Sequence, residues 1–199
     1  MKAIPPASTR ELEALISRTG SGDAGAFATL YDRTSAIVFG LVLRIVGDRA
    51  EAEEVVQESF LQLWRRAASF DPARGSPLAW ITMTARSRAI DRIRSDASYR
   101  GAIAGLGEEG SKQPVGDSAA DPEETASLRE RHALVKRALA GLSDEQRQAL
   151  ELAFFKGLSH SEIARLTETP LGTIKSRIRA AVKKLEEVLG PVVRAGGNG

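Results

Sequence analysis

The stretch TPLGTIKSRIRAAVKKL, residues 169–185, combines a periodic apolar pattern with an undiluted positive charge. Ile174, Ile178 and Leu185 recur at helical spacing, as a buried stripe requires. With about 100° per residue, the apolar positions lie within about 40° of Ile174, whereas a polar set lies roughly 100° to 200° away. The segment therefore predicts a helix with an apolar back and a cationic front. The front consists of Lys175, Ser176, Arg179 and Lys183; Arg177 and Lys184 add further charge, and the stretch contains no acid.

The segment before this helix, GLSHSEIARLTETP (residues 157–170), predicts a short helix and a tight connection. Ser159 and Glu162 match a capping box, and Ile163, Ala164 and Leu166 are expected to point inward. Two such helices predict a helix-turn-helix, whose front would meet phosphates and base edges in a DNA major groove. The alternative is a solvated basic face on an ordinary packing helix. The candidate DNA-binding residues are Thr173, Lys175, Ser176, Arg177, Arg179 and Lys183.

The first half of the chain predicts four further helices. The first spans residues 10–19, with Gly20 as its stop. The second runs from a cap at Asp23 to Gly47, and the third begins at a cap, Asp48. The fourth opens at Ser76-Pro77 and ends at about Arg94. The residues expected to point inward are Leu12, Leu15, Ile16, Phe27, Leu30, Tyr31, Val38, Leu41, Val42, Ile45, Val55, Val56, Phe60, Leu63 and Trp64.

From about residue 95 to residue 124 the composition changes to Gly, Ala, Ser and Pro, with an excess of acids. Such a segment cannot bury enough apolar surface to offset chain entropy, so it predicts a flexible acidic linker. Helices resume after Pro122; the first is expected to bury Leu128, Val135, Leu139 and Leu142, and Ser143 with Gln146 caps the next. We expect Gly190-Pro191 to end the last helix.

The fold expected is all-α, with two small helical domains joined by the linker. No run was expected to reach the ~20 apolar residues of a membrane span, and no signal peptide is apparent at the N-terminus. The chain has no cysteine and two distant histidines, so a metal site is not expected. A cofactor and a small-molecule substrate are not expected either. A cytoplasmic location fits the lack of cysteine. The expected boundaries are a tail at 1–9, domains at 10–95 and 122–190, the linker at 96–121 and a tail at 191–199.

Two stretches of the first domain carry functional signals. RGSPLAWITMTARSRAIDRIRS, residues 74–95, sets several arginines against one acid, with Trp80 nearby. This combination suits the binding of single-stranded DNA, because cations can follow a phosphate backbone and an aromatic ring can stack on bases. The alternative is core packing, which is the more common role of a tryptophan. GDRAEAEEVVQESFLQLWRR, residues 47–66, places Glu51, Glu54 and Glu58 along one helix face, at spacings of three and four residues. These acids indicate a docking face for a basic partner or a solvated helix face. Acid–base catalysis is not expected of them, because no nucleophile or phosphate-binding loop accompanies them.

Together these three stretches resemble a bacterial RNA polymerase sigma factor of the extracytoplasmic-function (ECF) group. AEAEEVVQESFLQLWRR is similar to the region 2 helix that docks on the clamp helices of polymerase β′. FDPARGSPLAWITMTARSRAIDRIRS is similar to the segment that opens and reads the −10 element, and the stretch from Leu142 to Leu185 is similar to the region 4 helix-turn-helix for the −35 element. The resemblance implies partners: core polymerase (β′ clamp helices and β flap), promoter DNA and an anti-sigma factor.

The resemblance also assigns roles to individual residues. It implies polymerase contacts at Glu54, Gln57 and Glu58, and −10 contacts at Ser87, Arg88, Asp91 and Arg92. Gln62 is added to the candidate polymerase contacts, and Trp80 to the candidate −10 contacts because of its stacking surface. Ser87 departs from the asparagine common in the family, and a serine reaches less far and offers fewer hydrogen bonds than an amide. An ordinary DNA-binding regulator with a sensing or dimerising first domain is the main alternative. An enzymatic first domain is a more distant one.

Overall fold

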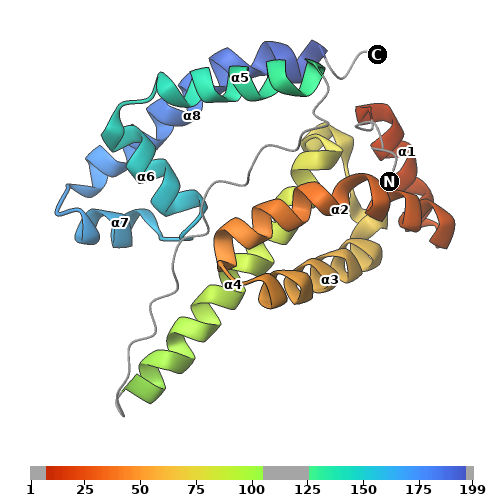
Figure 1. Ribbon diagram of the computed structural model, residues 1–199, viewed down its shortest axis with the longest axis horizontal. Coiled ribbons are helices and arrows are strands. Elements are labelled where there is room, and N and C mark those ends of the chain that lie inside the picture. Colours follow the sequence, from red (N-terminus) through yellow and green to blue (C-terminus); the bar gives the residue numbers. More distant parts are fainter. Residues whose placement is uncertain (1–7, 105–125, 196–199) are drawn as a thin grey trace. The chain divides into compact units, whose positions relative to one another are not determined.

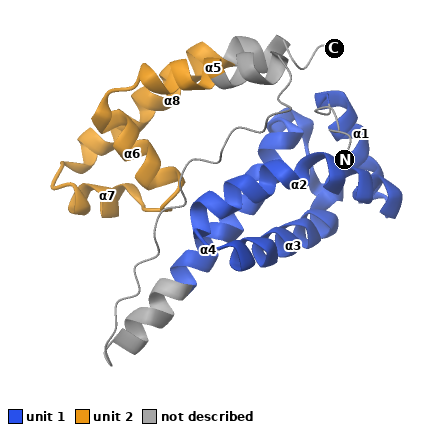
Figure 2. Cartoon of the chain, viewed as in Figure 1, with its two compact units in different colours: residues 1–116 blue, residues 117–199 orange. Residues whose placement is uncertain are grey.

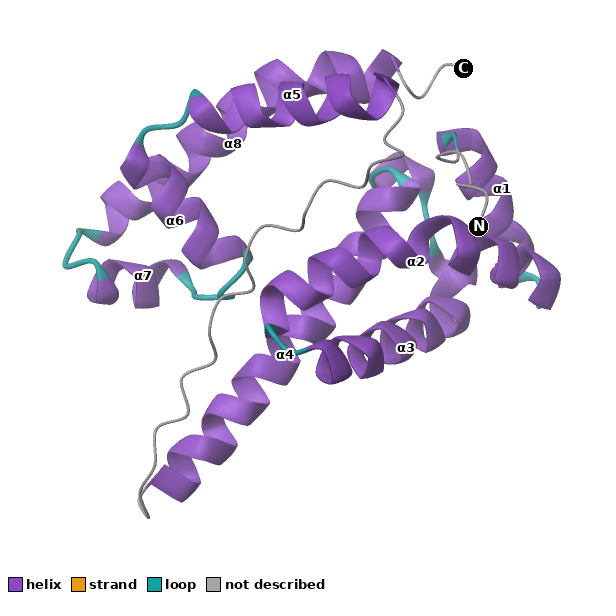
Figure 3. Ribbon diagram, in the orientation of Figure 1, coloured by secondary structure: helices purple, strands orange, loops and turns teal. Residues whose placement is uncertain are grey.

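The computed structural model describes residues 8–104 and 126–195, and every regular element in these two ranges is helical (Figure 3). The chain divides into two compact units, residues 1–116 and residues 117–199 (Figure 2). The expectation of an all-α fold with two helical domains is confirmed. The predicted linker lies largely outside the described residues.

Within residues 8–104 the first unit contains four α-helices and two short 3₁₀ turns (Figure 1). They are α1 (Thr9–Gly20), α2 (Ala24–Val46), α3 (Arg49–Arg66), η1 (Ala67–Ser69), η2 (Pro72–Arg74) and α4 (Pro77–Ala104). Asp23 accepts a hydrogen bond from the Ala26 amide and Asp48 one from the Glu51 amide, as helix N-caps do. Gly47 ends α2 in the left-handed conformation at φ 78°, which glycine adopts without steric cost. These local signals fix where α2 and α3 begin and where α2 ends.

Helix α2 forms the centre of the first unit, packed against α1, α3 and α4. Leu30, Val38 and Val42 are almost completely buried. Contrary to the sequence expectation, α2 is long and apolar enough to span a membrane by length and mean hydropathy. The central helix of a globular domain meets the same criteria, and the burial of this stripe by three neighbouring helices accounts for its apolar character.

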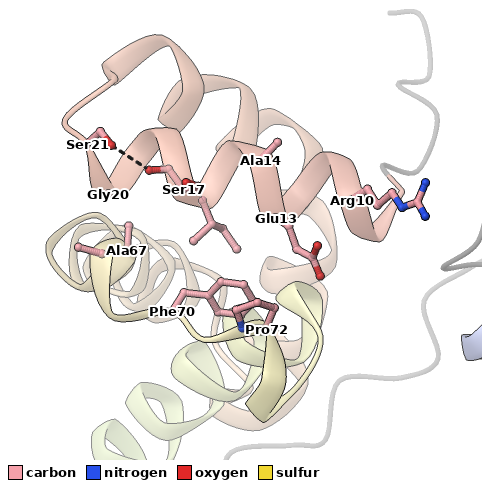
Figure 4. Close-up of a pocket in the computed structure, with 11 residues that line it drawn as sticks. Arg10, Glu13, Ala14, Ser17, Gly20, Ser21, Ala67, Phe70 and Pro72 are labelled. Atoms are coloured by element: carbon pink, nitrogen blue, oxygen red, sulfur yellow. Dashed lines mark hydrogen bonds between the residues drawn. The ribbon is translucent and has the colours of Figure 1, made fainter.

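The end of α1 lies directly against η1. A Cβ atom added to Gly20 would lie 2.8 Å from the backbone nitrogen of Ala68, so only glycine allows this approach. From the sequence, Gly20 was expected only to end the first helix, whereas the structure also gives it a packing role. Beside this contact α1 and the two 3₁₀ turns enclose a hollow of about 620 Å³, into which Phe70 and Pro72 turn (Figure 4). None of the candidate site residues lines this hollow.

Replacing Gly20 by alanine is expected to lower the free energy of unfolding by about 1–3 kcal/mol, because the backbones of α1 and η1 must separate. Gly40→Ala is the matched control: it lies within α2 with no atom within 4 Å of its added Cβ, so helix propensity should make it neutral or stabilising by up to ~1 kcal/mol. Urea unfolding of the two variants measures the difference. Equal stability of both would show that the α1–η1 contact is readily relaxed.

The second unit contains α5 (Ala126–Ala140), α6 (Asp144–Phe154), α7 (His160–Leu166) and α8 (Leu171–Ala195). Both predicted capping boxes are present: Ser143 with Gln146 opens α6, and Ser159 with Glu162 opens α7. Helix α8 contacts each of the other three helices, so it organises the unit. Where the structure describes side chains in this unit, residues 133–189, the buried apolar ones are Ala138, Leu142, Ala149, Ile163, Ile174 and Ala181.

Two helices are longer than expected. Helix α4 continues to Ala104 instead of ending near Arg94, into the start of the predicted linker. No proline interrupts this stretch, and each added residue contributes a backbone hydrogen bond at little further cost. Helix α8 continues through Gly190-Pro191 to Ala195, so these residues do not end it. Both cases show the weakness of local stop signals when a helix is already formed.

Several residues expected to point inward do not. In α5, Val135 and Leu139 are about 40% exposed, and the buried positions are Ala138 and, beyond the helix, Leu142. Ala138 and the half-buried Leu134, one turn earlier, lie on the buried side of α5, and Val135 and Leu139 lie toward solvent. Leu166 is 63% exposed at the end of α7, where the chain turns. Tyr31 is 39% exposed, yet its ring centroid lies 4.6 Å from that of Phe60. Leu128 has no described side chain.

Candidate nucleic-acid interface and docking face

The buried back of α8 fixes the orientation of its front. Ile174 and Ala181 are fully buried, and Ile178 and Leu185 are half-buried. On the opposite side the front residues are all exposed. They are Lys175, Ser176, Arg179 and Lys183. Because the back is anchored, the helix presents the front residues as a fixed row toward solvent. This is the arrangement that the opening stretch of sequence predicts.

The turn between α7 and α8 sets the angle of entry into α8. Glu168 adopts a left-handed conformation at φ 48°, which is uncommon for a residue with a side chain. The amide of Thr169 donates to the carbonyl of Ala164 at 3.0 Å, and the amide of Ile174 donates to the carbonyl of Pro170 at 3.1 Å. The first of these bonds closes the turn, and the second begins the helical hydrogen bonding of α8.

Thr173 and Arg177 lie apart from the front. Both are half-buried, and by helical geometry they lie about 100° or more from Arg179. Arg177 is close enough to Glu145 to help lower the pKa of that carboxyl, after the larger effects of hydrogen bonds from Ser143 and from its own amide. The structure therefore places four of the six candidate residues on the front. Arg177 lies on the side toward the start of α6, and Thr173 is half-buried beside the front.

Lys184 makes hydrogen bonds within the domain. Its ammonium group donates to the carbonyl of Gly141 and to Oε1 of Gln146, both at 3.2 Å. The same Gln146 oxygen accepts from the amide of Ser143 in the capping box. Lys184 thus connects α8 to the turn between α5 and α6, away from the front.

The outer side of α3 carries three of the predicted polymerase contacts. Glu54, Gln57 and Glu58 are exposed, with 64% and 52% of the two glutamate side chains accessible. Leu61, which is 50% exposed, lies within the same arc by helical geometry. Sequence analysis missed it, although its spacing of three and four residues from Glu58 and Gln57 was the available signal. We call these four residues, Glu54, Gln57, Glu58 and Leu61, the docking face.

The exposed side of α4 brings together part of the predicted −10 set. At about 100° per residue, Trp80, Ser87, Asp91 and Arg88 fall within an arc of roughly 100°. Ser87 and Asp91 are exposed, whereas Trp80 and Arg88 are half-buried. The Trp80 ring lies 5.3 Å from that of Phe70, so it packs partly against the chain itself, as the alternative reading of this tryptophan expected.

Helices α3 and α4 are joined by a polar seam. Arg92 contacts Glu54 through Nη1 at 3.1 Å and Glu58 through Nη2 at 3.6 Å, and only 26% of its side chain is accessible. Nε of Arg88 donates to Oε1 of Gln62 at 2.7 Å in a partly buried position. The residues that the resemblance assigns to polymerase and those it assigns to DNA therefore contact one another directly.

A further pair of arginines lies on α4. Burial lowers the pKa of Arg86, and the charge of Arg94 lowers it further. Arg94 is exposed and Arg86 half-buried. Arginine keeps its charge at physiological pH, so this pair adds positive potential beside the −10 set.

The chain matches known families in both units. Residues 30–99 match Sigma-70 region 2, and residues 132–185 match Sigma-70, region 4. The chain is 39% identical over 185 residues to the ECF RNA polymerase sigma factor SigK of Mycobacterium tuberculosis, covering 93% of this chain and 97% of that one. It is 40% identical over 187 residues to SigK of Mycobacterium sp. strain KMS, covering 93% and 94%.

Among solved structures, the chain is similar to SigE of Rhodobacter sphaeroides in complex with the anti-sigma ChrR. The identity is 33%, the TM-score 0.45, and the match covers 91% of this chain and 99% of that one. The identity to the SigK proteins extends over nearly the whole chain and includes both matched regions. The protein belongs to the ECF group of RNA polymerase sigma factors.

Proposed function

We propose that this chain binds core RNA polymerase through the docking face of α3, engages the −10 element with the exposed side of α4 and reads the −35 element with the front of α8. The observation that carries the −35 assignment is the anchored back of α8, which presents an exposed row of cations next to a capped α7. A helix with this support can enter a major groove without losing its place in the domain.

The docking face has the composition of a protein-binding surface. An exposed leucine surrounded by carboxylates and an amide resembles an apolar anchor with a polar rim. Its acids match a basic partner surface, which would give orientation and a fast on-rate. We assign this surface to the β′ clamp helices of polymerase, and the second domain to the β flap, on the family resemblance.

Three further assignments rest on membership of the family. The chain acts as a transcription initiation factor in the cytoplasm and carries out no enzymatic reaction of its own. An anti-sigma factor holds it inactive by covering the docking face or the DNA-binding sides. Run-off transcription with core polymerase, promoter fragments and the purified chain tests the central function. A chain that yields no promoter-specific transcript in this assay would contradict it.

The front of α8 makes a specific prediction. Lys175→Ala and Arg179→Ala are each expected to weaken transcription from −35-dependent promoters, because a lost base or phosphate contact costs about 1–3 kcal/mol. Affinity for core polymerase should stay unchanged, since α3 is intact. Promoter output and a core pull-down measure the two effects.

Lys156→Ala is the matched control for these two variants. It removes an exposed cation of the same domain that lies outside α8. Normal output from this control with reduced output from the front variants would support base and phosphate reading by the front. Equal losses in all three would indicate a general effect of charge.

A further inference from the structure

The hydrogen bond between Gln62 and Arg88 links two helices that the resemblance assigns to different partners. Gln62 is half-buried, and by helical geometry it lies on the side of α3 toward α4, outside the arc of the docking face. Its Oε1 accepts from Nε of Arg88 at 2.7 Å. The two residues are 26 positions apart in sequence, so this is a tertiary contact.

The geometry of this bond determines what Arg88 can do. A guanidinium group has five N–H donors in a fixed planar fork. When Nε is bound, the plane of the group is fixed, and the terminal nitrogens remain on the side away from the bond. In this structure the bond therefore restricts the rotation of Arg88 and orients its donors from a half-buried base.

We propose that Gln62 is a positioning residue for Arg88 in promoter binding, rather than a polymerase contact. This inference rests on the proposed function of α4 in reading the −10 element. An arginine held in one orientation loses less side-chain freedom when it binds a phosphate or a base. Gln62 therefore acts on DNA through Arg88, although it lies on the helix that docks on polymerase.

The test uses the full chain in complex with core polymerase. Gln62→Met keeps the length of the side chain and removes the acceptor, whereas Gln62→Glu keeps an acceptor oxygen. Core affinity is measured by titration, and promoter opening by permanganate reactivity of unpaired thymines in complexes saturated with the chain. We expect Gln62→Met to retain core affinity within about twofold and to reduce opening about tenfold, in line with a lost hydrogen bond to a charged group.

Two comparisons distinguish positioning from a merely structural role. Gln62→Glu should restore most of the opening, because its carboxylate still accepts from Nε of Arg88. In an Arg88→Ala background Gln62→Met should cause no further loss, because the group that it orients is absent. Circular dichroism of each variant checks that the helices are retained.

Three results would overturn the inference. They are a loss of core affinity with normal opening in saturated complexes, additive losses in the double variant, and no rescue by Gln62→Glu. Failure of the proposed function has a different signature: the unmodified chain would open no promoter at all. An active unmodified chain with additive losses would reject the positioning role alone.

Discussion

Reversing the charge of Glu54 and Glu58 to lysine is expected to abolish measurable binding to core RNA polymerase while the chain keeps its helices. Both carboxylates are exposed on the docking face, so reversal removes two attractive contacts and adds repulsion toward a basic partner. With about 2–5 kcal/mol for each truncated charge pair at an interface, the double variant should bind at least roughly 1,000-fold more weakly. Titration of labelled core polymerase measures this loss.

The polar seam makes controls necessary, because the same carboxylates pair with Arg92 inside the chain. Arg92→Met removes the internal pairs and leaves the docking acids in place, so it should bind core polymerase with nearly normal affinity. Glu53→Lys reverses an exposed acid of the same helix that pairs with Arg49 outside the docking face. If Arg92→Met lost core binding as completely as the double reversal, the internal pairs would be responsible and the docking role would be wrong.

Leu61→Asp is expected to have the second largest effect, a loss of about 2–4 kcal/mol in core affinity, the range of an interface hot spot. The side chain is 50% exposed within the arc of Glu54, Gln57 and Glu58, so it is the apolar anchor available to a partner that covers this face. Aspartate at this position should leave the fold intact and place an unpaired charge in the interface.

Ile37→Asp is the matched control for this substitution. Ile37 is also 50% exposed, but it lies on α2, outside the docking face. Fluorescence anisotropy with core polymerase should separate the two variants by at least about tenfold. Similar affinities for both would remove Leu61 from the interface.

The parts of the fold that sequence could predict are those fixed by neighbouring residues. Asp23, Asp48, Ser143 and Ser159 each cap a helix through the amide three residues beyond the cap position, so the information lies within one turn. The register of α5 was mispredicted, because Val135 and Leu139 were expected to be buried, whereas Ala138 is buried and Leu134 is half-buried. An apolar pattern that fits two faces of a helix does not by itself determine which face packs against the rest of the domain.

Contacts between distant segments were not predictable. The bonds of Arg88 and Arg92 to α3 join residues 26 and 38 positions apart. A sequence pattern indicates that each helix has a polar side, but the relative rotation of two packed helices depends on the whole core. Gly20 is a similar case, because its close neighbour Ala68 lies on a separate element.

The position of Lys184 has a consequence for the response of −35 binding to ionic strength. A protein cation that neutralises a DNA phosphate releases condensed counterions, and each such contact steepens the dependence of log K on log salt by about 0.9. Lys184 is engaged at the α5–α6 turn and Arg177 lies toward α6, so Lys175, Arg179 and Lys183 are the three of the five cations in residues 169–185 that lie on the front. Their combined slope is about −2.7, compared with about −4.5 for all five. Binding by this helix should therefore tolerate rising salt better than its sequence charge suggests.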